Sequence, residues 1–163
     1  MEKTKQQQGF TLLELLVTIV IAAIIAAIAI PALQTTIINN RVEATANDLR
    51  NMFIRKRNQA ISNGQPRLIT NAMATTDIAD KYNDIVIKRN DGASSTIIIA
   101  ADGAVDSTDL VHIGFSVCYT GNNSKIRNKA VVLFPSGLAS IKDATQLLAN
   151  DNDESVAQQK IDC

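Results

Sequence analysis

The stretch Gly9-Phe10-Thr11-Leu12-Leu13-Glu14-Leu15-Leu16 opens an apolar run that continues to Ile30 and is followed at once by Pro31. The 21 residues of this run, from Phe10 to Ile30, carry a single charge, that of Glu14. About 20 apolar residues suffice for a helix to cross a hydrocarbon core of roughly 30 Å. The run has no internal Gly or Pro and is rich in Leu, Ile and Ala, so helix is its favoured state. We therefore expect residues 10–31 to form a transmembrane helix.

The leader, residues 1–9, is short and polar, with Lys3 and Lys5 against Glu2. Positive charge before a span predicts that the amino terminus stays in the cytoplasm and that the rest of the chain lies outside. A secretory signal has an apolar stretch of only about 7–15 residues, with its small cleavage-site residue after the stretch. Here the run is longer and Gly9 precedes it, so the pattern differs from a conventional secretory signal.

Glu14 is the feature of the run that needs a physical reason. A carboxylate at the centre of a membrane helix costs about 2.5–3.5 kcal/mol on insertion scales, and less near the helix end. One interpretation is that Glu14 reaches toward the lipid interface. The other is that it pairs with a positive charge supplied by a partner protein. Cleavage after Gly9 would create such a charge, because Phe10 would then carry a free α-amino group.

The residues from Gly9 to Leu16 resemble the type III signal of type IV prepilins and of type II secretion pseudopilins. The resemblance implies cleavage between Gly9 and Phe10 by the prepilin peptidase, and N-methylation of Phe10. Glu14 and Pro31 fall where this family has its assembly glutamate and, in many members, a helix proline. The implied partners are other minor pilins, the major pilin, the peptidase and the inner-membrane platform.

Residues 32–64 read as an amphipathic continuation of the same helix. Apolar residues recur at helical spacing, whereas most charged residues fall off that stripe. The stripe consists of Ile38, Val42, Ala46, Leu49, Phe53 and Ala60. Asn63-Gly64-Gln65-Pro66 predicts the stop, with Gly64 as a left-handed cap and Pro66 just beyond it.

Residues 65–163 are expected to form a β-rich head in the periplasm. Short β-branched segments alternate with turn residues, which predicts antiparallel hairpins packed on the amphipathic helix and an α+β fold. The predicted strands are Arg67–Thr70, Ile85–Arg89, Thr96–Ala100, Val111–Tyr119, Ala130–Phe134 and Leu138–Ile141. Val111–Tyr119 alternates clearly and should bury one face. Phe134-Pro135-Ser136-Gly137 predicts a turn between two strands.

The head resembles the FimU/GspH group of minor pilins and minor pseudopilins, on the residues Val131-Val132-Leu133-Phe134-Pro135-Ser136-Gly137. Three functions remain open. The first is a minor pilin in the priming or tip complex of a type IV pilus, supporting pilus formation and twitching motility. The second is an H-type minor pseudopilin of a type II secretion system, and the third is a DNA-binding minor pilin for natural transformation. The first function implies a single-pass inner-membrane protein that lies in the pilus, at the cell surface, after assembly.

The two cysteines, Cys118 and Cys163, are expected to form a disulfide, because an exported head lies in an oxidising compartment. The bond would tie the carboxyl end to a central strand and close a loop of about 46 residues. On the loop-entropy model that closure is worth at most roughly 4 kcal/mol. Cys118 shares a strand face with His112 and not with Phe115, so the bond should lie outside the main core.

Several classes of function find no support in the sequence. His112 is the only histidine, so no zinc site of the usual kind and no Ser-His-Asp triad can form; we expect neither a catalytic residue nor a metal, cofactor or small-molecule substrate. The segment Asn150–Glu154 lacks the spacing and glycine of a calcium loop. The net charge is zero, Arg55-Lys56-Arg57 is a small cluster, and the Gly-Arg element of the DNA-uptake branch is missing, which argues against nucleic acid.

Overall fold

The computed structural model describes residues 10–89, 96–106 and 113–143. The chain divides into two compact units, residues 1–36 and residues 37–163. Helix α1, Leu12–Asn63, begins in the first unit and ends in the second, and it continues through Pro31 without a break. The predicted single long helix is therefore confirmed.

The carboxyl end of α1 is closed by its own backbone. The N–H of Gly64 donates to the carbonyl of Ile61 at 3.4 Å, and the N–H of Gln65 donates to the carbonyl of Ala60 at 3.2 Å. Gly64 has a φ of 60°, the left-handed conformation that this pair of bonds requires. The predicted glycine cap is thus present, and it satisfies two carbonyls that the helix end would otherwise leave unpaired.

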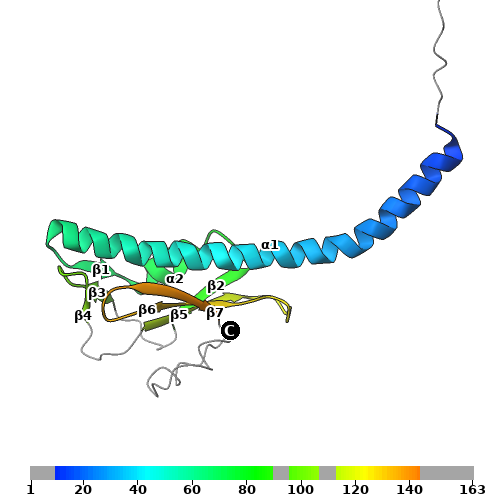
Figure 1. Ribbon diagram of the computed structural model, residues 1–163. Coiled ribbons are helices and arrows are strands. Elements are labelled where there is room, and N and C mark those ends of the chain that lie inside the picture. Colours follow the sequence, from blue (N-terminus) through cyan, green and yellow to red (C-terminus); the bar gives the residue numbers. More distant parts are fainter. Residues whose placement is uncertain (1–9, 90–95, 107–112, 144–163) are drawn as a thin grey trace, which may run out of the picture. The chain divides into compact units, whose positions relative to one another are not determined.

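The second unit packs two antiparallel sheets and a short helix on the carboxyl-terminal half of α1 (Figure 1). The first sheet has the order β1-β3-β4, and its strands are Arg67–Ile69, Ile97–Ile99 and Val105–Asp106. The second has the order β2-β5-β6-β7, with strands Ile85–Arg89, Ile113–Tyr119, Lys129–Leu133 and Ala139–Asp143. Helix α2 spans Asn71–Ala79. The predicted fold class, a long helix packed on antiparallel β-structure, is confirmed.

The core lies between α1 and the two sheets, with α2 at its side. Five residues of the predicted helix stripe are fully buried: Val42, Ala46, Leu49, Phe53 and Ala60. The rings of Phe53 and Phe115 meet with their centroids 5.3 Å apart and an interplanar angle of 43°. Tilted aromatic pairs of this kind add about 0.5–1.5 kcal/mol beyond the area that they bury. The apolar spacing read from the sequence therefore identifies the face of α1 that holds the head.

The expectation that β5 buries only one face is wrong. Gly114, Ser116 and Cys118 are buried on the face opposite Phe115, and Ala130 and Val132 of β6 form a second apolar cluster with Phe134. Gly has no apolar side chain to mark it in a hydrophobic pattern, although it is among the residues most often fully buried, and Ser116 is buried here against the usual preference of Ser. Cys118 is not part of the cluster that packs on α1, and it is not a free thiol.

Two elements were not predicted. Helix α2 is short and contains Thr, Thr and Asp, which are poor helix formers. It begins at a cap, where the N–H of Met73 donates to Thr70 Oγ1 at 3.3 Å. Strand β4 has two residues and owes its existence to pairing with β3. Strand β2 has its predicted bounds, and the ends of the other strands differ from the predicted ranges by one or two residues. Val111 and His112 lie outside the described residues.

Two glycine turns hold the sheets together beside the end of α1. The N–H of Val105 donates to the carbonyl of Pro135 at 2.8 Å, so β4 is tied to the predicted β6–β7 turn. The Nε of Arg57 donates to the carbonyl of Ser136 at 3.4 Å. At Gly137, where φ is 74°, an added Cβ would lie 1.8 Å from the carbonyl oxygen of Gly103. The two turns thus meet backbone to backbone.

We predict that Gly137→Ala destabilises the head by more than about 3 kcal/mol, because the new methyl group overlaps a backbone oxygen that cannot rotate away. The matched control is Gly64→Ala, since Gly64 also has positive φ but has nothing within 4 Å of the added Cβ. That variant should lose only about 1–2 kcal/mol from backbone strain. Pulse proteolysis of the full chain in urea measures both, and equal losses would contradict the steric explanation.

Candidate functional site

The first turn of α1 forms a cap around Thr11 and Glu14. The N–H of Glu14 donates to Thr11 Oγ1 at 3.2 Å, and the N–H of Leu15 donates to the Thr11 carbonyl at 3.2 Å. Thr11 is thus the N-cap residue and Glu14 stands at the third helical position, the spacing of a capping box. A carboxylate in the first turn also interacts favourably with the helix dipole. Among the described residues, none forms an ion pair with Glu14.

The remainder of the run is apolar and exposed. Most of its large side chains are more than half exposed, among them Leu12, Leu13, Ile24, Ile25 and Ile28. The most apolar 18-residue window of α1 has a mean hydropathy of 2.9 and no buried residue. By length and composition this segment can cross a membrane, which fits its prediction as a membrane anchor.

Threonine hydroxyls in this segment are satisfied within the helix. Thr18 Oγ1 donates to the Leu15 carbonyl at 2.7 Å, and Thr35 and Thr36 donate to the carbonyls of Pro31 and Ala32. Such bonds remove the cost of placing a hydroxyl group in an apolar environment. The Pro31 ring leaves the carbonyl of Ala27 without its helical donor, since proline has no N–H.

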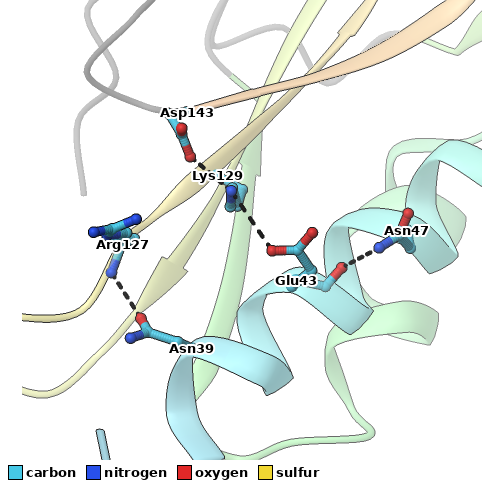
Figure 2. A network of polar contacts seen from close by, with 6 residues as sticks. All are labelled: Asn39, Glu43, Asn47, Arg127, Lys129 and Asp143. Atoms are coloured by element: carbon cyan, nitrogen blue, oxygen red, sulfur yellow. Dashed lines mark hydrogen bonds and ion pairs between the residues drawn. The ribbon is translucent and has the colours of Figure 1, made fainter. Parts of the chain in front are cut away.

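In the second unit, a polar network fastens α1 to β6 and β7 (Figure 2). The Nζ of Lys129 lies 2.6 Å from Asp143 Oδ1 and 3.6 Å from Glu43 Oε2. The backbone N–H of Arg127 donates to Asn39 Oδ1 at 2.9 Å. The contacts with Glu43 and Asn39 join residues nearly 90 positions apart in the sequence, and they fix the strand on the polar flank of the helix.

The network shifts the pKa of one of its members. The hydrogen bond that Lys129 donates to Asp143 raises the pKa of Lys129 above its ordinary value of 10.5, against the opposing effect of burial. A raised lysine pKa means that the folded state holds the proton more tightly than the unfolded state. The resulting stability is fully present below pH 10.5 and is lost as the pH rises through the pKa of the folded state.

A second polar region surrounds Tyr82. Arg41 pairs with Asp84 at 2.9 Å, and its guanidinium carbon lies 5.6 Å from the centre of the Tyr82 ring. The Nζ of Lys81 lies 5.5 Å from the same ring and 3.4 Å from Asp48. The neighbouring depression has a volume of about 510 Å³ and is lined by Arg41, Lys81, Tyr82, Asn83, Asp84 and Thr120. Each cation here is paired with its own carboxylate.

The structure places only some of the predicted site residues. Phe10 lies exposed just before α1, Glu14 and Pro31 lie in the helix, and Cys118 lies buried in β5. Gly9 and Cys163 lie outside the described residues, so the cleavage site and the disulfide stay predictions. His112 and the segment Asn150–Glu154 also lie outside. Within the described ranges, no group of three His, Cys, Asp or Glu side chains could hold a metal.

Two structural roles were not predicted from the sequence. The spacing of Thr11 and Glu14 is the signature of a capping box, so that role could have been found from the sequence. The ion pairs of Lys129 could not, because their partners come from α1 and β7 and no local pattern joins them.

Comparisons with known proteins agree with this structure. A family model described as the prokaryotic N-terminal methylation motif matches residues 4–30. Among solved structures, the type IV minor pilin FimU of Pseudomonas aeruginosa, strain PAO1, is similar with a TM-score of 0.52 and 11% sequence identity. The match covers 63% of this chain and 89% of the FimU chain. No curated protein sequence is significantly similar to the chain.

The amino-terminal residues thus carry the prokaryotic methylation motif, and the helix-on-sheet fold is that of a type IV minor pilin. More particularly, its head has the fold of the minor pilin FimU. The identity is too low to transfer more than the fold.

We predict that Lys129→Met, which keeps the apolar stem and removes the ammonium group, lowers stability by about 1–2 kcal/mol at neutral pH. The difference from wild type should stay constant up to pH 10 and shrink above it, as the wild-type ammonium group deprotonates. Lys81→Met is the control, because the Lys81 side chain is 58% exposed and should contribute nothing measurable. Urea unfolding at a series of pH values tests this; equal losses in both variants would contradict it.

Proposed function

We propose that this chain is a minor pilin that takes part in the priming or tip complex of a type IV pilus, and so supports pilus formation and twitching motility. The observation that carries the proposal is the combination of a prepilin methylation motif with a FimU-like head on one chain. A protein of this build acts through the surfaces that it presents to other subunits.

The amino-terminal geometry supports a specific assembly step. Cleavage between Gly9 and Phe10 would place a free, N-methylated amine one residue before the Thr11 cap. Glu14 has no described ionic partner within its own chain, so its carboxylate is available to the amine of a neighbouring subunit. In an apolar helix array the pairing neutralises two charges, each of which is costly alone.

The proposal includes location and partners. Before assembly the chain is a single-pass inner-membrane protein with its head in the periplasm, where a Cys118–Cys163 disulfide forms. After assembly it lies in the pilus at the cell surface. Its partners are the prepilin peptidase, the inner-membrane platform, the major pilin and other minor pilins.

For the assembly step, we predict that Glu14→Ala and Glu14→Gln are both processed to the mature form but enter pili at least about tenfold less, because neither supplies a charge for the neighbour's amine. Both variants retain the Glu14 N–H that Thr11 caps, so the helix start is preserved. Gly9→Val is the contrasting variant and should remain at the precursor mass in the membrane. Immunoblots of sheared pili and membrane fractions measure both steps. Full incorporation of Glu14→Gln would show that the negative charge of Glu14 is not required and would contradict the pairing.

For the role of the protein, we predict that deleting it reduces surface pili and twitching without reducing the pool of mature major pilin. A priming subunit acts in few copies by lowering the cost of starting a filament, so its loss reduces the number of filaments more than their composition. Electron microscopy counts the pili, and mass spectrometry of purified pili gives the subunit stoichiometry.

Two other outcomes would overturn this role. Intact piliation with loss of enzyme secretion across the outer membrane would indicate the H-type pseudopilin. Intact piliation and secretion with loss of DNA uptake, together with salt-resistant DNA binding by the purified protein, would indicate the transformation pilin.

A further inference from the structure

The loop between β5 and β6, residues 120–128, is cationic and is held by hydrogen bonds of its own. Its sequence, Thr-Gly-Asn-Asn-Ser-Lys-Ile-Arg-Asn, contains two cations and no acidic residue. Asn123 organises the turn: its Oδ1 accepts from the N–H of Lys125 at 3.0 Å, and its carbonyl accepts from the N–H of Ile126 at 3.1 Å. The N–H of Tyr119 donates to Asn128 Oδ1 at 3.1 Å and closes the base of the loop.

The two cations of the loop are exposed as a result of this hydrogen bonding. Ile126 packs against the main core, and its neighbours on either side, Lys125 and Arg127, are both exposed. Neither of these two side chains has an ionic or hydrogen-bonding partner among the described residues. Lys129, by contrast, is held by Asp143 and Glu43. The loop therefore exposes two positive charges that form no ion pair with the described residues, and hydrogen bonds hold the backbone that carries them.

The loop is anchored near the start of the second unit. The Arg127 N–H bond to Asn39 ties it to a helix position that follows Ile30, the end of the apolar run, by only nine residues (Figure 2). Nine helical residues span about 14 Å. Lipid headgroups extend about 5–8 Å beyond each side of the hydrocarbon core. Chain length alone thus keeps the two cations within roughly one Debye length, about 10 Å, of the headgroups.

We propose that Lys125 and Arg127 bind the phosphate groups of anionic phospholipids while the protein is anchored in the membrane, and so hold the head against the bilayer before assembly. The two cations, Asn39, Glu43 and Lys129 line a depression of about 310 Å³. The carboxylate of Glu43 opposes an anion there, but it is paired with Lys129. A lysine or arginine near an anionic surface contributes about fivefold to binding.

The other basic cluster of the head does not fit this role. Arg55, Lys56 and Arg57 follow Ile30 by 25 or more residues, about 38 Å along a helix. Arg57 also donates to the Ser136 carbonyl. This cluster therefore supplies a matched control with the same kind of charge at a different place.

The proposal rests on the membrane anchoring that is part of the proposed function, but its test needs no pilus. Full-length protein carrying a fluorescent amino acid at Ser124 is reconstituted into vesicles with an energy acceptor on the headgroups. One set is phosphatidylcholine alone, and the other is an equal mixture with phosphatidylglycerol. We compare wild type with Lys125→Gln/Arg127→Gln and with the control Arg55→Gln/Lys56→Gln. Pulse proteolysis verifies that all three are folded.

We expect strong energy transfer in the anionic vesicles only, weakened by high salt. In the anionic vesicles, the ratio of lipid-bound to unbound heads should fall at least about fivefold in the loop variant and stay unchanged in the control variant. Equal transfer in both lipids, or an unchanged loop variant, would overturn the proposal. If the loop variant contacts lipid normally yet disappears from sheared pili, the partner is an acidic surface of a neighbouring subunit instead. Each of these failures leaves the minor-pilin function standing, because that function is decided by the deletion.

Discussion

The apolar stripe of α1 is the constraint on which the rest of the second unit depends. Val42, Leu49 and Phe53 are fully buried there, while the same helix is exposed on all sides between Leu12 and Leu33. One continuous helix therefore has two kinds of surface, an exposed apolar one along its first half and one packed on the sheets along its second. The polar network at Lys129 lies beside this stripe and fixes where the sheet sits on it.

Much of this architecture is readable from local sequence. An unbroken run of Leu, Ile, Val and Ala predicts the first half of α1, and spacing of three and four predicts its buried face. Gly64 and Gly137 mark the helix cap and the β6–β7 turn, because both positions need positive φ. Signals of this kind depend on residues that are neighbours in the chain, and they were reliable here.

Features that depend on distant partners could not be predicted. Strand β4 exists because β3 and the Pro135 carbonyl bind it, and the second buried face of β5 depends on small residues that carry no hydrophobic signal. The ion pairs of Lys129 bring together a helix and two strands. At the amino terminus, by contrast, the residues that matter are consecutive, so most of the candidate site could be proposed from the sequence, although Gly9 and Cys163 lie beyond what the structure describes.

The internal pairing of Thr18 has a consequence for how subunits align. Between Leu12 and Ile30 the polar side chains are those of Glu14 and Thr18. The Thr18 hydroxyl donates its proton to the Leu15 carbonyl of the same helix. The remaining surface is a nearly uniform set of Leu, Ile, Val and Ala side chains, against which a neighbouring helix can slide by a turn with little change in contact energy. In a filament of the kind proposed, the carboxylate of Glu14 would therefore set the axial register between subunits. The apolar surface would contribute binding energy but would not fix the register.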